Sequence, residues 1–477
     1  MLFQNIHLIT IMLPLVMGFL SFLIRDKFTK QVNLFYLMVF ISFFAYIVYC
    51  IFNFDFSGQK DYSMVVGGWA KSIGIELKFN LNCAFIVLFL TSIMIIFLSA
   101  IYRGFIGHAF RGFACIMLCG ANGLVLTNDI FNCYVFFEIM CITTYIMYSY
   151  GNNVVCLENT YDYTILSSFV GVIFLVVIAF LYQVTGNLNI DLMHHYIDLF
   201  YVNKSISATY VFFILAMAIK IGLYPFHSIL FGIYKNISLK YLIFIASVSS
   251  IVYPCFIIKI ISQLFGNYVI MNNEYMNVVL KIFGSIGFIF FNFSAIIANS
   301  VINFIIFLSF SQISLFVFCV PYFIEPQIIN GIFLMIASGS VIKACMLGIL
   351  YKIEEQQPLL LNFEKKDFKY ITSNIYKSLF VILLFILSGM PISIVFMSKW
   401  HIISGIITVS DNILYLSIVA IGFAVDAFAC LSFMKKILSK GEDDKFLVVK
   451  TDYLLAFIIM CILILLIVST FFFNSLN

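Results

Sequence analysis

Charge is scarce in this sequence. Only 10% of the residues are Asp, Glu, Lys or Arg, whereas 63% are hydrophobic. A soluble domain carries roughly 25% charged residues to keep its surface hydrated, so the composition excludes a water-soluble globule. The formal net charge of +4 is small for 477 residues and does not form the clustered basic footprint of a nucleic-acid-binding protein. We therefore expect no nucleic-acid partner and a surface covered mostly by lipid.

Clustered metal ligands are also missing. The 12 cysteines are scattered along the chain, and no C-x-x-C pair occurs. The closest pair, Cys115 and Cys119, has no second pair beside it, and the six histidines show no metal spacing. Zinc and iron–sulfur sites need clustered ligands. The sequence therefore predicts no metal and no cofactor, with cysteines that serve as small apolar packing residues.

No polar stretch is long enough to form a soluble domain. The longest ones lie near 54–78, 185–207 and 352–374, and each is shorter than the roughly 40 residues that an independent core needs. No G-x-G-x-x-G or Walker motif occurs, which argues against a nucleotide site. Any chemistry must therefore lie within the apolar segments.

The apolar segments are long enough to cross a membrane, because a span needs about 20 residues. Roughly 14 candidates satisfy this length rule. They lie near 5–24, 33–53, 80–101, 110–127, 130–150, 162–184, 208–230, 241–264, 278–299, 301–320, 328–351, 375–397, 402–431 and 451–473. The predicted fold class is an all-α polytopic membrane protein. We divide it into N-terminal helices over 1–110, a membrane core over 111–435, and a C-terminal loop and last helix over 436–477.

The termini and the basic loop residues predict an orientation. The apolar run from Ile9 to Ile24 lacks a basic n-region and an A-x-A site, so we interpret it as the first span rather than a signal peptide. Basic residues mark cytoplasmic loops, which places both termini outside the cytoplasm of a bacterial-type inner membrane. The residues that carry this bias are Arg25, Lys27, Lys30, Arg103, Arg111, Lys235, Lys240, Lys352, Lys365, Lys366, Lys369, Lys377, Lys435, Lys436, Lys440, Lys445 and Lys450.

Four charged residues lie inside predicted spans. They are Glu138, Lys220, Lys343 and Lys399. An ionisable residue at the bilayer centre costs about 2.5–3.5 kcal/mol and is a functional candidate by default. Burial favours the neutral form of lysine and a nearby carboxylate favours the charged form, so a lysine between these influences can take up and release a proton. We predict a proton relay; the alternative for each residue is a structural ion pair or a snorkelling side chain.

Two predicted spans are interrupted beside a charge. One break follows Lys220 and the other precedes Lys399. Proline and glycine disrupt helices, and interrupted helices line cavities in transporters. The residues expected at these breaks, as candidates for gating or access, are Gly222, Pro225, His227, Gly389 and Pro391. Two carboxylates are weaker relay candidates: Asp129, which we expect to cap a helix, and Asp426, which has no partner in the neighbouring sequence.

These segments, in this order, resemble the antiporter-like subunits of respiratory complex I and of Mrp-type cation/proton antiporters. The family pattern is an early Glu, Lys-x-x-x-x-Pro-x-His, a Ser-rich stretch, a Lys after small residues, and Gly-x-Pro with a Lys downstream. Here the pattern reads Phe137-Glu138; Lys220 to Pro225 and His227; Ser311-Gln312-Ile313-Ser314; Ile342-Lys343-Ala344; and Gly389-Met390-Pro391 with Lys399. The resemblance covers roughly 120–430. The sequence of residues 396–400 is most similar to that of the D-type subunits of Mrp antiporters.

The resemblance implies two inverted five-helix repeats and obligate membrane partners. It implies Glu138 paired with Lys220, Lys343 in mid-channel and Lys399 toward an exit, with Ser311 and Ser314 as weaker candidates. The family usually has a second lysine in the span after the first break, whereas 247–253 contains none here.

Three functional hypotheses stay open. The first is the proton-translocating subunit of an Mrp-like antiporter that exchanges protons for a monovalent cation such as sodium. The second is an N-type proton-pumping subunit of NADH-quinone oxidoreductase, with no redox centre of its own. The third, motivated by the missing lysine, is a structural subunit of such a complex that has lost transport.

Overall fold

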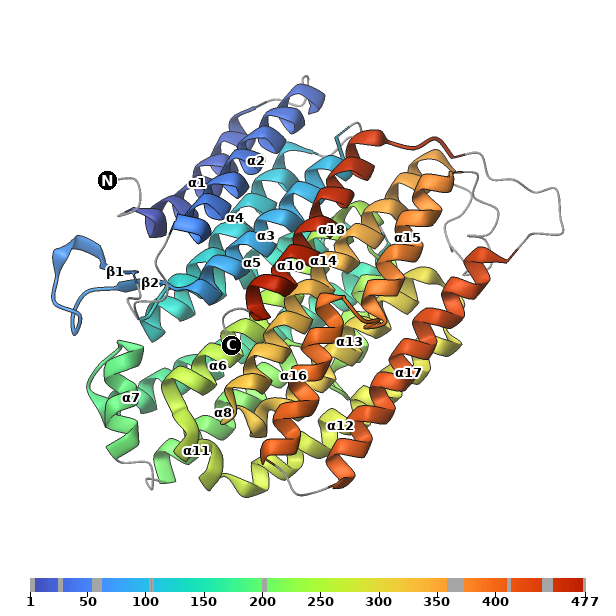
Figure 1. Cartoon of the computed structure of the whole chain (residues 1–477). Coiled ribbons are helices and arrows are strands. Elements are labelled where there is room, and N and C mark those ends of the chain that lie inside the picture. Colours follow the sequence, from blue (N-terminus) through green and yellow to red (C-terminus); the bar gives the residue numbers. More distant parts are fainter. Residues whose placement is uncertain are drawn as a thin grey trace.

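The protein is a bundle of long helices with one short β-hairpin at one end (Figure 1). The computed structural model describes residues 5–24, 29–53, 62–102, 104, 107–151, 153–199, 204–357, 373–409, 413–439 and 449–474. Because the apolar runs leave no water-accessible partner for the backbone, each satisfies its own hydrogen bonds as a helix. The all-α membrane fold expected from the sequence is confirmed.

The helices and strands have the following bounds. The first part contains α1 (Ile6–Leu23), α2 (Thr29–Asn53), β1 (Tyr62–Val65), β2 (Glu76–Phe79), α3 (Leu81–Ala100), α4 (His108–Leu126), α5 (Ile130–Tyr148), α6 (Val154–Thr185), α7 (Ile190–Leu199), α8 (Lys204–Lys220), α9 (His227–Asn236) and α10 (Leu239–Lys259). The second part contains the π-helical turn η4 (Ile260–Phe265), α11 (Gly266–Asn272), α12 (Glu274–Ile297), α13 (Val301–Cys319), α14 (Pro326–Gln356), α15 (Asn374–Leu387), α16 (Ile394–Val409), α17 (Ile413–Leu438) and α18 (Tyr453–Asn474).

The number of spans differs from the sequence expectation. Among the described residues, 11 helices are long and apolar enough to cross a membrane, and three shorter apolar helices accompany them; the expected count of about 14 is not confirmed. The segments predicted as spans over 208–230 and 375–397 each contain a helix end. The span predicted over 402–431 is wrong, because α16 ends at Val409 and α17 begins at Ile413, with residues 410–412 outside the described part of the chain.

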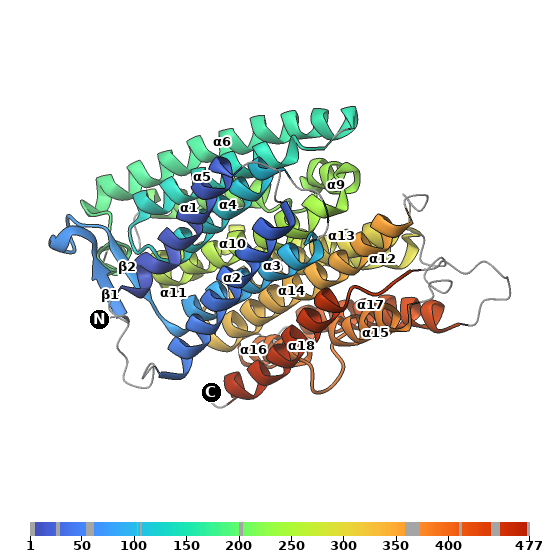
Figure 2. The same ribbon diagram turned by 90° about the horizontal axis from the view of Figure 1, so that it is seen from above.

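The centre of the bundle includes α3, α10 and α14. The apolar windows of α3 and α14 are entirely buried by protein, and that of α10 is mostly buried. α14 packs against α3, α10, α13 and α16, and Figure 2 shows α3 and α14 in the middle of the bundle with α6 at its edge. α6 instead exposes large apolar side chains every three or four positions, as expected of a lipid-facing helix. These side chains are Tyr161, Ile165, Phe169, Val172, Val176 and Phe180.

Two of the basic residues assigned to loops are buried within helices. Arg111 belongs to α4 and is only 1% exposed; it donates to Asn33 Oδ1 over 2.7 Å and to Ser21 Oγ over 3.1 Å. Lys352 belongs to α14 and forms ion pairs with Glu355 and Asp452. Their assignment to positive loops is therefore wrong, because hydrogen bonds compensate charge within the bundle. Eight other residues of that prediction lie outside the described part of the chain: Arg25, Lys27, Arg103, Lys365, Lys366, Lys369, Lys440 and Lys445.

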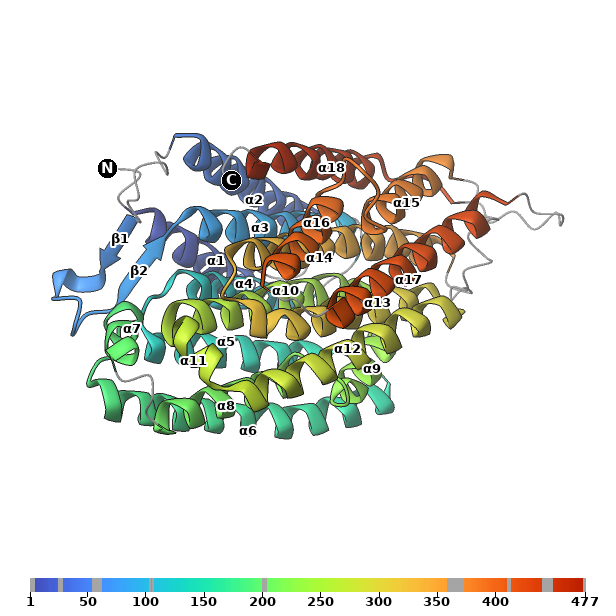
Figure 3. The same cartoon turned by 60° about the horizontal axis from the view of Figure 1, so that its bottom comes forward.

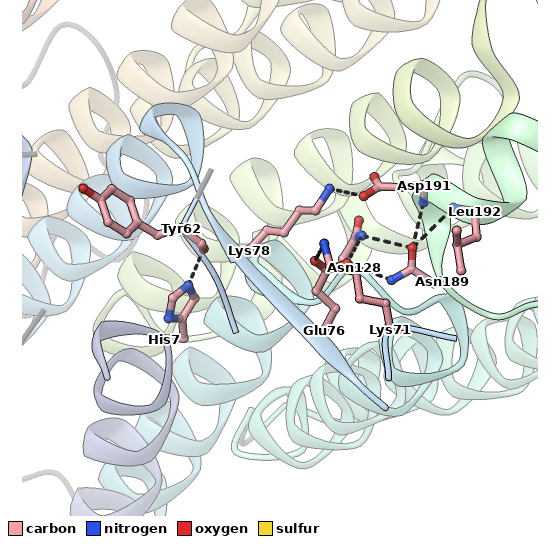
Figure 4. Close-up of polar contacts among 9 residues, drawn as sticks. All are labelled: His7, Tyr62, Lys71, Glu76, Lys78, Asn128, Asn189, Asp191 and Leu192. Carbon is pink, nitrogen blue, oxygen red and sulfur yellow. Dashed lines mark hydrogen bonds and ion pairs between the residues drawn. The ribbon is translucent and has the colours of Figure 1, made fainter. Parts of the chain in front are cut away.

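The hairpin is fastened to the bundle by a buried carboxylate, Glu76 (Figure 4). β1 and β2 pair antiparallel, with Val65 opposite Glu76. Glu76 is fully buried; its Oε1 lies 2.7 Å from Lys71 Nζ. Its Oε2 accepts from Asn128 Nδ2 over 2.9 Å and from Asn189 Nδ2 over 2.8 Å. The carboxylate therefore ties the hairpin to the α4–α5 and α6–α7 junctions.

Acid is expected to weaken the attachment of the hairpin to the bundle through Glu76. Burial alone would raise the pKa of Glu76, but hydrogen bonds from Lys71, Asn189 and Asn128 lower it from 4.5 to about 2. A carboxyl group whose pKa is lowered by folding stabilises the fold above its unfolded pKa, and this contribution disappears as the pH falls toward its folded pKa. The shift corresponds to about 3 kcal/mol, lost between about pH 4.5 and 2.

The measurement is thermal unfolding of the purified protein in detergent across this pH range, with Glu76→Gln as the comparison. The Gln variant cannot titrate at this position, so its stability should fall less steeply with acid than that of the parent protein. Parallel pH profiles for the two proteins would contradict the assignment.

Candidate functional site

Glu138 lies halfway along α5, against α6. Asp129 immediately precedes α5, and its carboxylate caps the helix by accepting from the Asn132 backbone N–H over 2.7 Å. The Glu138 carboxylate occupies space left by Gly171 of α6, since a Cβ added at Gly171 would lie 2.2 Å from Glu138 Oε1. A side chain at position 171 would therefore displace the carboxylate.

Lys220 is the last residue of α8, at the first predicted break. The interruption is confirmed: α8 ends at Lys220 and α9 begins at His227. Gly222 has φ +70°, and a Cβ there would lie 2.7 Å from Leu230 Cδ1, so glycine fits the left-handed conformation and the close packing. The carbonyl end of a helix carries partial negative charge, which favours the Lys220 ammonium at this position. Pro225 lies between the two helices and is exposed.

The Lys220 ammonium lies among aromatic rings and a hydroxyl group. Lys220 is 1% exposed, and its Nζ donates to Ser167 Oγ over 2.5 Å. Four ring centroids lie between 5.1 and 5.5 Å from this nitrogen, at distances that permit cation–π attraction. They belong to Phe137, Tyr145, Tyr163 and Tyr253. We call this set of four rings the aromatic box.

Glu138 and Lys220 do not form a direct ion pair. Both residues are described, and no contact within 4.0 Å joins their charged atoms. They still interact electrostatically over a longer distance. The pairing implied by the resemblance is therefore indirect here, and the rings and hydroxyl take the place of a contacting carboxylate.

His227 begins α9 within another group of rings. Its imidazole stacks on Tyr224 with centroids 5.6 Å apart and meets Phe291 edge-on at 4.7 Å. It also makes T-shaped contacts with Phe310 at 5.9 Å and Phe290 at 6.1 Å. The structure thus places His227 beside the first break, with its ring packed against aromatic side chains.

Lys343 lies deep in α14 and contacts a neutral partner. It is 4% exposed, and its Nζ donates to Gln312 Oε1 of α13 over 2.8 Å. Gly339, one turn earlier, gives Gln312 room, since a Cβ there would lie 2.6 Å from Gln312 Nε2. Sequence reasoning missed Gln312 as this partner, although it stands in the middle of the Ser-rich stretch.

The serines of that stretch point elsewhere. Ser311 Oγ donates to Asn292 Oδ1 over 2.6 Å, and Ser314 Oγ donates to the Phe310 carbonyl of its own helix over 2.9 Å. The structure therefore brings neither Ser311 nor Ser314 to a lysine. Both side chains link or stabilise helices α12 and α13.

Lys399 lies at the second break and contacts a carboxylate. α15 ends at Leu387 and α16 begins at Ile394; Gly389 between them has φ +77°, and Pro391 is exposed. Lys399 Nζ forms an ion pair with Asp426 Oδ2 of α17 over 2.7 Å. It also donates to the Ser388 carbonyl at the end of α15 over 3.0 Å. Both breaks thus place a lysine at the carbonyl end of a helix.

Another cavity lies away from these lysines. Its volume is about 100 Å³, and Lys78, Asn128, Lys259 and Asn330 line it near the hairpin. Lys259 donates to the carbonyls of Val125 and Thr127, which fastens the end of α10 to the end of α4. Within the described part of the chain, no group of three or more His, Cys, Asp or Glu side chains lies close enough to hold a metal ion.

Comparison with known proteins assigns the family. Residues 127–424 match the family described as "NADH:quinone oxidoreductase/Mrp antiporter, TM". The D subunit of the Na⁺/H⁺ antiporter of Alkalihalophilus pseudofirmus is 26% identical over 166 residues, which are 34% of this chain and 34% of that relative. The chain thus matches about a third of that relative's length.

Two solved structures share the fold along nearly the whole chain. A chain of the membrane-bound sulfane sulfur reductase, an archaeal respiratory membrane complex, has a TM-score of 0.83 at 18% identity, covering 99% of this chain and 96% of its own. A chain of the Mrp complex from Dietzia sp. has a TM-score of 0.77 at 17% identity, covering 94% and 83%. Fold, membrane helices and family match agree, and the chain belongs to the family of membrane subunits shared by NADH:quinone oxidoreductase and Mrp antiporters.

Proposed function

We propose that the chain is the proton-translocating membrane subunit of an Mrp-like antiporter that exchanges a monovalent cation, sodium, for protons. Glu138, Lys220, Lys343 and Lys399 are its proton-relay residues. Each can hold or release a proton without any bound cofactor. The subunit works with other membrane subunits, as do the proteins that share its fold.

The observation that carries the proposal is the set of three buried lysines on separate helices. Lys220 contacts a hydroxyl group and rings, Lys343 contacts an amide, and Lys399 contacts a carboxylate. The three lysines thus have different partners, which are a neutral hydroxyl group with aromatic rings, a neutral amide and a carboxylate.

The proposal extends to topology and organisation. The membrane core over 111–435 contains the residues that match the family, 127–424. We place both termini outside the cytoplasm of a bacterial-type inner membrane, on the basic residues of the loops. Asp129 caps α5 and Asp426 neutralises Lys399, so we assign Asp129 a structural role and Asp426 a role with Lys399.

A second candidate is the N-type proton-pumping subunit of NADH-quinone oxidoreductase, because the matched family includes both complexes. The same four residues would relay protons there, driven by electron transfer in other subunits. The absence of a lysine over 247–253 favours a third candidate, a structural subunit without transport.

The deciding experiment isolates the tagged chain with its native partners in mild detergent. The partners are identified by mass spectrometry, and vesicles that contain the complex are assayed for sodium-driven proton movement and for NADH oxidation. Sodium-driven proton exchange without NADH oxidation supports the antiporter. NADH oxidation by flavin-bearing partners would overturn it in favour of the second candidate, and an assembled complex without either activity would favour the third.

Gly171→Ala is expected to slow exchange about tenfold, below the 10²–10⁴-fold effect of losing a proton-transfer group outright. The new methyl group must displace the Glu138 carboxylate, since its Cβ would lie 2.2 Å from Oε1. The titratable group itself remains. The measurement is the exchange rate in vesicles, normalised to the amount of the chain in the membrane.

Gly348→Ala is the matched control for this substitution. Gly348 also lies in a membrane helix, but the nearest atom to its added Cβ is Ile96 Cγ2 at 3.6 Å. This variant should exchange at the parent rate. If Gly171→Ala also kept the parent rate, the placement of Glu138 against α6 would have no functional importance.

A further inference from the structure

Lys220 and Lys343 lie on different helices, and two small cavities separate them. The first has a volume of about 30 Å³ and is lined by Lys220. The second has a volume of about 20 Å³ and is lined by Lys343. A cavity needs about 10–15 Å³ to hold a water molecule, so each has room for water.

The two cavities share one wall, which is built mainly of hydroxyl groups. Four residues line both cavities: Tyr234, Ala246, Ser250 and Ser309. Tyr234 belongs to α9, Ala246 and Ser250 to α10, and Ser309 to α13. Three of the four carry a hydroxyl group, so the wall between the two lysines is polar although the helices around it are apolar.

Two further hydroxyl groups at these cavities have no hydrogen-bond partner within the described part of the chain. Ser247 is 2% exposed and lines the second cavity, whereas Tyr253 is 3% exposed and lines the first. Neither Ser247 Oγ nor Tyr253 OH has a hydrogen-bond partner among the described residues. A buried hydroxyl group without a partner costs about 1–3 kcal/mol, and an ordered water molecule removes that cost. Both cavities therefore have a physical reason to hold water.

Hydroxyl contacts continue across this wall. Tyr234 OH lies 3.4 Å from Ser249 Oγ, and Tyr148 OH donates to Tyr234 OH over 3.5 Å. Ser250 Oγ lies 2.7 Å from Ser340 Oγ of α14. Ser340 is one turn before Lys343 on the same helix, which brings the hydroxyl groups from α10 to the lysine.

We propose that a hydroxyl bridge carries protons between Lys220 and Lys343. It consists of Tyr234, Ser247 and Ser250, with Ser340 and water in the two cavities. The inference rests on the proposed function, and it assigns the transfer to α10, which contributes no ionisable side chain over 247–252.

The transfer balances without any other reactant. The Lys220 ammonium gives a proton to a neighbouring oxygen, and each hydroxyl group or water passes on one proton as it accepts another. The Lys343 amine receives the last proton. Only N–H and O–H bonds break and form, and a hydroxyl group suits this role because it both donates and accepts.

The test measures proton exchange in vesicles that contain the whole complex, with Ser250→Ala and Tyr234→Phe. Each variant is expected to slow exchange about tenfold, less than the 10²–10⁴-fold of a sole proton-transfer group, because cavity water replaces part of the bridge. Ser250→Thr restores the hydroxyl group and should restore most of the rate. Tyr210→Phe is the control, since Tyr210 OH is buried and lines neither cavity.

The outcomes separate this inference from the proposed function. Slow Ser250→Ala and Tyr234→Phe variants, with an active Ser250→Thr variant and an active control, support the bridge. Parent rates for the first two variants, in a complex that Lys343→Ala inactivates, would overturn the bridge and leave the antiporter standing. If Ser250→Ala and Ser250→Thr slowed exchange equally, the bridge would also be overturned. The packing of residue 250, and not its hydroxyl group, would then determine the exchange rate. Full exchange in the Lys343→Ala complex would instead refute the proposed relay itself.

Discussion

Lys343→Ala is expected to abolish cation/proton exchange, with a rate reduced at least about 100-fold. Lys343 is buried in the central helix α14, where its ammonium contacts Gln312 Oε1. A neutral amide neither supplies nor removes a proton, so Gln312 can orient the lysine but cannot replace it. The measurement is the exchange rate in vesicles that contain the native complex.

Two companion variants make this prediction specific. Lys343→Arg keeps a positive charge next to Gln312, but guanidinium does not release its proton in proteins, so this variant should be as inactive as the alanine variant. Lys281→Ala is the control, because Lys281 lies in α12 against the rings of Tyr322 and Tyr415. Substantial exchange in Lys343→Arg would show that the charge, and not proton release, is what the site requires.

Single and double substitutions of the Lys399–Asp426 ion pair are expected to affect stability and transport differently. The two side chains are 10% and 16% exposed and lie 2.7 Å apart. Removing one partner leaves a charge mostly buried and uncompensated, which lowers the free energy of unfolding by roughly 3 kcal/mol. The double variant Lys399→Ala/Asp426→Ala removes both charges, so most of that loss should be recovered. Exchange should remain lost, because no proton carrier is left at the second break.

The measurements are thermal unfolding of the complex in detergent and exchange in vesicles, for both single variants and the double variant. Lys352 and Asp452 form a comparable buried pair with a separation of 3.4 Å, outside the proposed relay. Lys352→Ala/Asp452→Ala should therefore keep its exchange activity. If Lys399→Ala/Asp426→Ala recovered exchange as well as stability, the Lys399–Asp426 pair would have a structural role and would not carry protons.

The helix interruptions could be predicted from the sequence because they depend on single residues. Glycine at 222 and 389 adopts a positive φ, which L side chains disfavour, and proline follows within three positions in both segments. The buried charges could likewise be found from hydropathy. Composition and the local sequence pattern were therefore enough to predict the fold class and the positions of the candidate lysines.

The partners of those lysines could not be predicted, because they come from other helices. Gln312 and Asp426 lie 31 and 27 positions from the lysines they contact, and hydropathy does not say which helix faces meet. The aromatic box has the same origin, since its rings come from α5, α6 and α10. Arg111 was misplaced for a related reason: its charge resembles a loop signal, whereas the hydrogen bonds that it donates to Ser21 of α1 and Asn33 of α2 accommodate it inside the bundle.

The depth of Lys220 and Lys343 in the bundle has an electrical consequence. α8 follows α7, and α14 begins beside the cavity near the hairpin, so both helices start at the hairpin end (Figure 3). Lys220 is 16 positions after Lys204, and Lys343 is 17 positions after Pro326. Each lysine is thus about 25 Å from that end, at 1.5 Å per residue.

A proton that moves between two groups at equal depth travels parallel to the membrane plane. The transmembrane potential does about 2.3 kcal/mol of work per 100 mV on a charge that crosses the whole bilayer, but almost none on a sideways displacement. The voltage can therefore act on the steps that bring a proton to Lys220 or release it beyond Lys343, while the rate of transfer between them should be nearly independent of membrane potential.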